Sequence, residues 1–380
     1  MFGITTSIFN EAGGLVKDWL KNPLNASFLY WYFLPAVALV LFQLFLIRPA
    51  LGYESPRIFT VDVPPSKSAV DLILQVLNAS VLVLIFLPLI IGIILSSVSG
   101  AILRFHQGTL PIMRPLARPW LKRNQKLSSK LYGPLQAKRR EYLFLASQGV
   151  RLVTVNGHEQ AEWVAESERT ELAEQLKAEI QALHESFEQV SAEHELPVAI
   201  ERVGPNDLAN TLALAEEYPF ERYSMDTAVF WPRLCAEIEP EKLESLTLSL
   251  GAMKGLLNIS FLSYLVAIES LIVGVVVQAG LIKTVGPPLL QIRWLLVAVL
   301  ISLIIGRGTY RAAVRAAYSA GSELRTAFDY YRGRVLRRFN LKVPADIDQE
   351  RVVWLKLAAF IRRGESFYFP SEFRREGSEE

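Results

Sequence analysis

Cysteine is almost absent from this chain, and so are patterns of metal-binding residues. Cys235 is the only cysteine among the 380 residues, which excludes an intrachain disulfide framework and an all-cysteine metal cluster. The four histidines form no His-Glu-x-x-His motif. We therefore expect no bound metal.

The short motifs of common enzyme classes are also missing. The sequence contains no P-loop, no Gly-x-Gly-x-x-Gly after a strand and no Gly-x-Ser-x-Gly. Serine, histidine and aspartate all occur, but no spacing places them as a triad. A lone cysteine is more often a small buried apolar residue than a nucleophile. We expect no catalytic residue and no cofactor, and enzymatic activity is the less favoured interpretation.

Apolar residues, in contrast, are abundant. They make up 51% of the chain, and the mean hydropathy is +0.26, which is typical of a membrane protein. A helix needs about 20 apolar residues to cross the hydrocarbon core. Four segments satisfy this requirement: 28–48, 72–98, 257–282 and 288–306. The last two are joined by a tight turn, which predicts an antiparallel hairpin.

Charge is strongly segregated although the net charge is only +2. Residues 104–140 contain ten Lys/Arg and no acid, and residues 141–250 contain 22 Asp/Glu against seven Lys/Arg. Basic residues next to spans face the cytoplasm. The sequence therefore predicts a multi-pass protein of the bacterial cytoplasmic (inner) membrane with both termini inside and an external loop at 49–71.

These patterns predict a mainly α fold. A four-helix transmembrane region carries a mostly helical cytoplasmic domain, with minor short strands, and a C-terminal helical extension. The expected parts are an N-terminal amphipathic segment 1–27, transmembrane helices 28–103, a cytoplasmic domain 104–255 (basic run 104–140, acidic part 141–250), a transmembrane hairpin 256–306 and C-terminal helices with a tail 307–380.

Periodicity locates elements within the cytoplasmic parts. Apolar residues recur every three or four positions from Leu172 to Val190, which predicts an amphipathic helix, a candidate coiled-coil strand. No breaker interrupts 240–282, so a helix about 60 Å long is expected there. Residues 346–362 predict a final helix. The segments 150–155 and 196–203 are candidates for short strands.

Several polar side chains lie at membrane depth. Glu269 falls near the middle of the third span, where a carboxylate is costly unless it is protonated, paired or facing water. The candidate intramembrane polar site comprises Glu269, Arg293, Gln75, Asn78 and Gln278, and Gln43 is a further polar side chain at membrane depth. One interpretation is a pathway for ions or protons. The other, which we favour, is that these side chains bond neighbouring spans or extend toward the headgroups.

The basic run 104–140 has two interpretations. Its Lys/Arg are interleaved with apolar residues and Trp120, as in some nucleic-acid sites. A cluster directly after a span is more simply attracted to anionic lipid headgroups. We expect contact with membrane lipids and no nucleic acid.

Reactive residue types are concentrated in 220–234, "FERYSMDTAVFWPRL". We expect a turn at Tyr218-Pro219 and then a short helix that Ser224 caps and Pro232 limits. The interpretation that we favour is a structural joint between the cytoplasmic domain and the helix that follows. The candidate lipid, phosphate or interface site within it comprises Arg222, Tyr223, Asp226, Trp231 and Arg233. Arg222 and Asp226 could form an ion pair, and Trp231 would lie at headgroup depth.

Two segments carry a resemblance. "LANTLALAEEYPFERYSMDTAVFWPRL" (208–234) and "ERVVWLKLAAFIRRGES" (350–366) resemble segments of uncharacterised bacterial multi-span membrane proteins with an Arg-Tyr-Gly-x-Asp … Trp-Pro-Arg-Leu pattern. Ser224 stands where that pattern has glycine, so a positive φ is not expected at this position. The resemblance implies four spans with a cytoplasmic domain, and it implies no activity.

Three functions remain open from the sequence. The first is a membrane scaffold that anchors a helical cytoplasmic domain, forms a homo-oligomer and recruits a cytoplasmic protein partner. Small residues at four-residue spacing, as at Gly92, Ser96 and Gly100, favour the close helix packing that an oligomer needs. The second is an oligomeric channel or transporter that uses Glu269. The third is a membrane enzyme acting on a lipid-like substrate.

Overall fold

The structure is a computed structural model of the full chain. It describes residues 28–51, 79–148, 150–155, 158–191, 196–197, 199–281 and 288–364. Two compact units are present. One comprises Met1–His106 with Pro219–Glu380, and the other comprises Gln107–Tyr218. Residues 219–255 therefore belong to the unit with the long apolar helices, whereas the sequence placed them in a cytoplasmic domain running from 104 to 255.

The fold is mainly α, as predicted, and four helical stretches are long and apolar enough to cross a membrane. This arrangement fits a multi-pass membrane protein. The first stretch combines the elements η2 (Leu29–Phe33), α4 (Leu34–Phe42), η3 (Gln43–Ile47) and α5 (Arg48–Ala50). The second is α7 (Ala79–His106), which continues beyond the predicted end at residue 98. The predicted start of that span, 72–78, lies outside the described residues.

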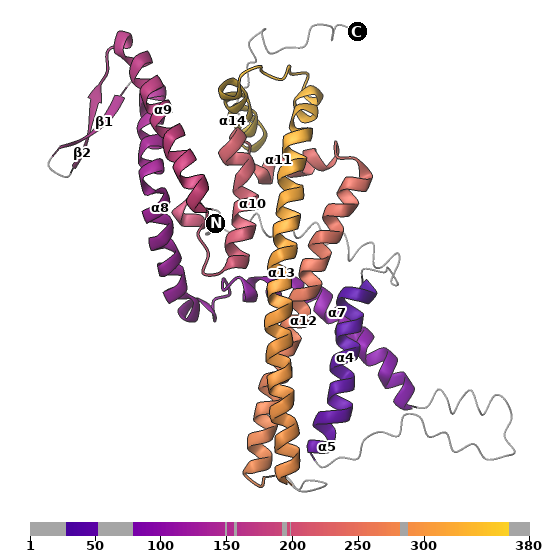
Figure 1. Ribbon diagram of the computed structural model, residues 1–380. Coiled ribbons are helices and arrows are strands. Elements are labelled where there is room, and N and C mark those ends of the chain that lie inside the picture. Colours follow the sequence, from indigo (N-terminus) through magenta and orange to yellow (C-terminus); the bar gives the residue numbers. More distant parts are fainter. Residues whose placement is uncertain are drawn as a thin grey trace, which may run out of the picture. The chain divides into compact units, whose positions relative to one another are not determined.

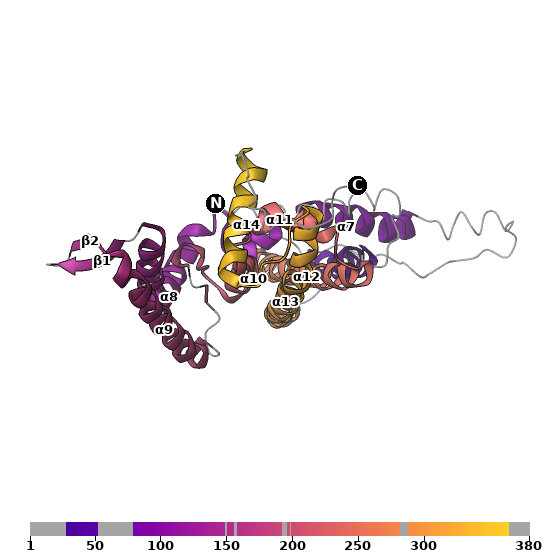
Figure 2. The ribbon, with the colours of Figure 1, turned by 90° about the horizontal axis from the view of Figure 1, so that it is seen from above.

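Helices α12 (Pro240–Gln278) and α13 (Pro288–Arg338) lie side by side in both views of the ribbon (Figures 1 and 2). They pack against one another along their length, and the two helices run antiparallel. Ser260 bonds the carbonyl of Gly306, while Glu237 near the start of α12 pairs with Arg338 at the end of α13. The predicted antiparallel hairpin is confirmed.

The apolar part of this hairpin is exposed on its outside. At about 1.5 Å per residue α12 is about 58 Å long and α13 about 77 Å, against a hydrocarbon core of about 30 Å. Exposed large apolar side chains are concentrated toward the Gln278 end of α12 and the Pro288 end of α13, as lipid-facing residues would be. In α12 these are Leu265, Ile268, Leu271, Ile272 and Val275, and in α13 Leu290, Trp294, Leu296, Val297, Leu300, Ile301, Leu303, Ile304 and Ile305.

The first stretch packs closely against α12. Trp31 lies over Gly255, where an added Cβ would come within 2.3 Å of the indole. Only glycine permits this approach. Near the other end, Ile47 and Ala50 join Val273, Val277 and Leu295 in a buried apolar cluster.

Two more helices complete this unit. Helix α11 (Thr227–Cys235) packs against α13, and α14 (Ile347–Arg363) packs against α11. The prediction of a final helix at 346–362 is confirmed. Figure 1 shows α14 beside α11 at the end of α13 that lies away from the connecting turn.

The second unit contains α8 (Arg114–Gln148), β1 (Val150–Val155), β2 (His158–Trp163) and α9 (Glu166–Ser191). Helix α10 (Asp207–Tyr223) begins in this unit, and its residues from Pro219 on belong to the other unit. Helices α8 and α9 pack on one another, as the predicted amphipathic pattern of α9 requires. A short 3-10 turn, η4 (Ile200–Arg202), precedes α10.

The strands of this unit are only partly as predicted. The strand expected at 150–155 is β1, and it pairs antiparallel with β2 in the register Val150 to Trp163. The strand expected at 196–203 is wrong, because its described residues lead into η4. Strand β2 was not expected, because "HEQAEW" is polar and lacks β-branched residues.

Candidate functional site

The segment 220–234 contains the end of one helix and the start of another. Helix α10 runs through Pro219, so the expected turn at Tyr218-Pro219 is wrong. The helix ends at Ser224, whose φ of 55° is left-handed. Its N–H donates to the carbonyl of Phe220 at 2.7 Å, and the N–H of Met225 donates to that of Pro219 at 3.1 Å. The expectation that serine excludes a positive φ is also wrong.

Asp226, and not Ser224, caps the next helix. Its Oδ1 accepts from the N–H groups of Ala228 at 3.0 Å and Val229 at 3.2 Å. Ser224 cannot serve as the cap because the left-handed turn ends α10 there. Pro232 lies inside α11 and does not end it.

The same carboxylate also holds the C-terminal helix. Asp226 forms an ion pair with Arg362 of α14, and the expected partner Arg222 is not its partner. The main-chain carbonyl of Arg222 instead accepts from Nε of Arg351 at 3.1 Å. The side chain of Arg222 is exposed, and so is that of Arg233, which donates to the carbonyl of Val229 at 2.6 Å.

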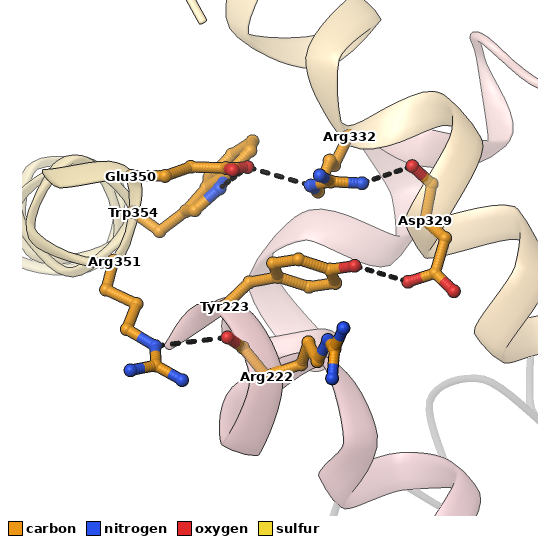
Figure 3. A network of polar contacts seen from close by, with 7 residues as sticks. All are labelled: Arg222, Tyr223, Asp329, Arg332, Glu350, Arg351 and Trp354. Carbon is orange, nitrogen blue, oxygen red and sulfur yellow. Dashed lines mark hydrogen bonds and ion pairs between the residues drawn. The ribbon is translucent and has the colours of Figure 1, made fainter. Parts of the chain in front are cut away.

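A network of polar contacts joins α10, α13 and α14 (Figure 3). The hydroxyl of Tyr223 donates to Oδ1 of Asp329 at 2.5 Å. The guanidinium of Arg332 lies 4.2 Å from the centroid of the Tyr223 ring and also donates to the carbonyl of Asp329. Its Nε donates to Oε1 of Glu350 at 2.9 Å, and the same oxygen accepts from Nε1 of Trp354 at 3.1 Å. Three helices are thus joined through Arg332.

Aromatic packing surrounds this network. Trp354 is fully buried and meets Phe230 edge to face, with 4.8 Å between ring centroids. Trp231 is 5% exposed, and the centroid of its ring lies 6.1 Å from that of Phe328. The expectation that Trp231 lies at headgroup depth conflicts with this burial, because its ring packs inside the protein. We call this assembly of network and aromatic residues the α11–α14 joint.

The α11–α14 joint has no arrangement of a nucleophile beside a base. Its carboxylates accept from tyrosine, arginine, tryptophan or main-chain donors, and its arginines bond carboxylates and carbonyls. Contacts of this kind hold the helices in fixed positions relative to one another. The α11–α14 joint brings Tyr223 and Asp226 together with residues that were not predicted from the sequence: Asp329, Arg332, Glu350, Arg351, Trp354 and Arg362.

Within the membrane part, Glu269 has a defined partner. Its Oε2 accepts from Nε2 of Gln43 in η3 at 2.5 Å. The carboxylate therefore bonds a neighbouring span. Gln278 and Arg293 are exposed and are not brought to Glu269, while Gln75 and Asn78 lie outside the described residues.

A second cluster, not predicted from the sequence, lies at the end of α7 around the buried side chain of His106. A ring nitrogen of His106 lies 3.2 Å from the carbonyl of Leu257, and the ring packs among Phe105, Tyr264 and Tyr310. The only sequence signal was a histidine at the end of an apolar run. Its partners on α12 and α13 (Leu257, Tyr264 and Tyr310) are more than 150 positions away, which no local pattern indicates.

Two further observations bear on chemistry. Among the described residues, no group of three or more His, Cys, Asp or Glu side chains is placed to hold a metal ion. Comparison with known proteins adds no assignment. No family model, no curated protein and no solved structure matches this chain.

Proposed function

We propose that this chain is a scaffold of the bacterial inner membrane, in which four spans anchor a helical assembly on the cytoplasmic side. The observation that supports this most is the α12–α13 hairpin. It continues beyond its apolar stretch as one antiparallel pair and ends in the α11–α14 joint.

The chemistry of the helix pair changes along its length. Near the connecting turn its contacts are apolar, as in the cluster of Val273, Val277 and Leu295. Farther away polar contacts are added: Ser249 donates to Glu323 at 2.9 Å, and Glu239 pairs with Arg334 at 3.4 Å. Exposed charged pairs belong in water, so this half of the hairpin is suited to a stalk outside the bilayer.

The α11–α14 joint supports a structural role for the end of the stalk. Glu350 is 3% exposed and is bonded by Arg332 and Trp354, so its charge is compensated within the protein. Buried, mutually satisfied polar groups favour one arrangement of helices over others. A scaffold needs such a fixed platform, on which the chain associates with a second copy or binds a cytoplasmic protein.

The channel alternative depends on Glu269. Its hydrogen bond to Gln43 supports a packing role, since the carboxylate is held by a neighbouring span of the same chain. The enzyme alternative depends on 220–234, where Asp226 caps a helix and Tyr223 bonds Asp329. Both observations favour the scaffold.

The test uses the full chain in lipid nanodiscs and in liposomes. Mass photometry of the nanodiscs is expected to show a homo-oligomer, and a photo-crosslinking residue at the exposed Leu355 is expected to yield one discrete product. Thr247, exposed on α12, is the control position. Ion flux in liposomes that Glu269→Gln abolishes, together with no discrete product from Leu355, would overturn the scaffold in favour of the oligomeric channel.

A further inference from the structure

Helix α8 carries an apolar stripe that its own unit does not cover. Ile112, in the turn ahead of the helix, is 77% exposed, Leu116 is 63% exposed and Trp120 is 59% exposed. Leu116 and Trp120 are four residues apart, which places them on one face of α8, and Ile112 precedes Leu116 by the same interval. Three large apolar side chains in a row on a helix surface mark a contact site more often than chance exposure.

Basic residues continue the same face. Arg123 and Lys130 follow Leu116 at intervals of seven residues, and Lys126 lies beside them. All three are exposed. The 104–140 run contains no acidic residue, so every charge that this stretch of chain brings to the face is positive. The face is therefore apolar over its first two turns and basic beyond them.

Along the basic part of α8, the side opposite the cations is the one that packs. Ser128 donates to the carbonyl of Pro197 at 3.1 Å, and Asn124 donates to that of Gly204 at 3.0 Å. Tyr132 is buried with Leu196 and Val203. The fold of this unit uses one side of the helix and leaves the stripe and its cations outside.

The chain itself keeps the stripe near the membrane. Ile112 follows His106, the last residue of the membrane-spanning helix α7, by six residues. A fully extended chain spans at most about 3.6 Å per residue, so the two lie within about 22 Å. That distance is smaller than the depth of the bilayer with its headgroups.

We propose that this face of α8, from Ile112 to Lys130, binds the surface of an anionic bilayer. Ile112, Leu116 and Trp120 enter the boundary between headgroups and acyl chains, and Arg123, Lys126 and Lys130 bind lipid phosphates. An exposed apolar stripe flanked by cations is the pattern of helices that lie in the interface. Nucleic acid is less suited, because the apolar side chains would stay in water. The proposal requires a membrane-spanning chain and is independent of any scaffold partner.

The test measures the depth of a nitroxide label on the full chain in nanodiscs. With Cys235→Ser as background, one label is placed by Leu116→Cys and the matched control by Ser129→Cys, which is exposed on another side of α8. In bilayers with 30% phosphatidylglycerol, the label at 116 is expected to be accessible to oxygen and protected from an aqueous nickel reagent. The label at 129 stays accessible to the nickel reagent.

Charge reversal then separates lipid from protein contact. Each of Arg123→Glu, Lys126→Glu and Lys130→Glu should lower the ratio of membrane-inserted to water-exposed label at position 116 by about fivefold or more. Trp120→Ser should lower it too, whereas Trp163→Ser, which removes a tryptophan 78% exposed on β2, should not. A label at 116 that is open to the nickel reagent in anionic bilayers would overturn the proposal. Protection from the nickel reagent that depends on the density of the protein and not on lipid charge would also overturn it, because a second copy of the chain would then cover this face of α8.

Discussion

The hydroxyl of Tyr223 donates to the carboxylate of Asp329 at 2.5 Å across 106 positions of sequence. Tyr223 is the last residue of α10, and Asp329 lies near the end of the 51-residue helix α13. Through this bond, the segment that leads into α11 is fixed to the end of the stalk. The tyrosine ring also supports Arg332, so one side chain contributes to both halves of the network.

Tyr223→Phe should destabilise the protein by about 1.5–3 kcal/mol, because it removes a hydrogen bond to a charged acceptor in a partly buried site. The ring and its contact with Arg332 remain. Thermal unfolding of the full chain in detergent measures the effect. Tyr330→Phe is the control, since Tyr330 is 73% exposed and should tolerate the change. Equal effects of both substitutions would show that the bond to Asp329 contributes nothing.

Glu350→Gln tests the other half of the network. The amide keeps an acceptor for Trp354 but leaves Arg332 facing a neutral group. Breaking an ion pair of which one partner is almost fully buried costs about 3 kcal/mol. Asp348→Asn breaks an exposed pair with Arg351 on the same helix and should cost less than about 0.5 kcal/mol. Denaturant titration of both variants gives the comparison, and a small loss in Glu350→Gln would remove the structural role of the network.

The two segments of the sequence resemblance meet in this network. Residues 208–234 contribute Tyr223, Asp226 and Phe230, and residues 350–366 contribute Glu350, Trp354 and Arg362. Both segments stand out in the sequence, but their contact could not be predicted from it, because pairing across more than a hundred residues leaves no periodic signal. Hydrophobic length and helical period, in contrast, are local. They were sufficient to predict the four long apolar helical stretches, the continuous helix α12 and α14.

The errors have local physical causes as well. A turn was expected at Tyr218-Pro219, yet α10 continues through Pro219 and the helix ends at the left-handed Ser224. Strand β2 is polar, so only its pairing with β1 defines it. Glu269 and Gln43 were each noticed as polar residues at membrane depth, and their hydrogen bond required the packing of η3 on α12.

A pair of glycines two residues apart in α13 allows a matched test of helix packing. A Cβ on Gly306 would lie 2.8 Å from the ring of Tyr264, whereas one on Gly308 would meet no atom within 4 Å. Gly306→Ala should therefore lower the melting temperature. Gly308→Ala should raise it or leave it unchanged, because alanine is favoured over glycine in a helix by about 1 kcal/mol. If both variants behave alike in detergent, α12 and α13 do not approach as closely as described.

Stability of the 107–218 unit should fall as the pH rises toward neutrality. Burial raises the pKa of Glu216 to about 7, from an ordinary value of 4.5, and the charge of Arg202 opposes the shift. Between these values the unfolded chain has released the proton while the folded chain retains it. The free energy of unfolding therefore decreases from pH 4.5 to about pH 7 and then levels. Hydrogen exchange of the α10 amides in Glu216→Gln should lose this dependence, and an unchanged profile would assign it to another group.

Ser224→Gly should stabilise the protein. A non-glycine residue at a φ of 55° carries a cost of about 1 kcal/mol, which glycine relieves in part while it adds freedom to the unfolded chain. Ser224→Val should destabilise by more, because a β-branched side chain is poorly accommodated in left-handed backbone. Thermal unfolding of both variants beside Ser322→Gly, a change at an exposed site inside α13, separates relief at a turn from the usual loss of helix propensity. Should glycine destabilise equally at both positions, the left-handed turn that ends α10 would not form in solution.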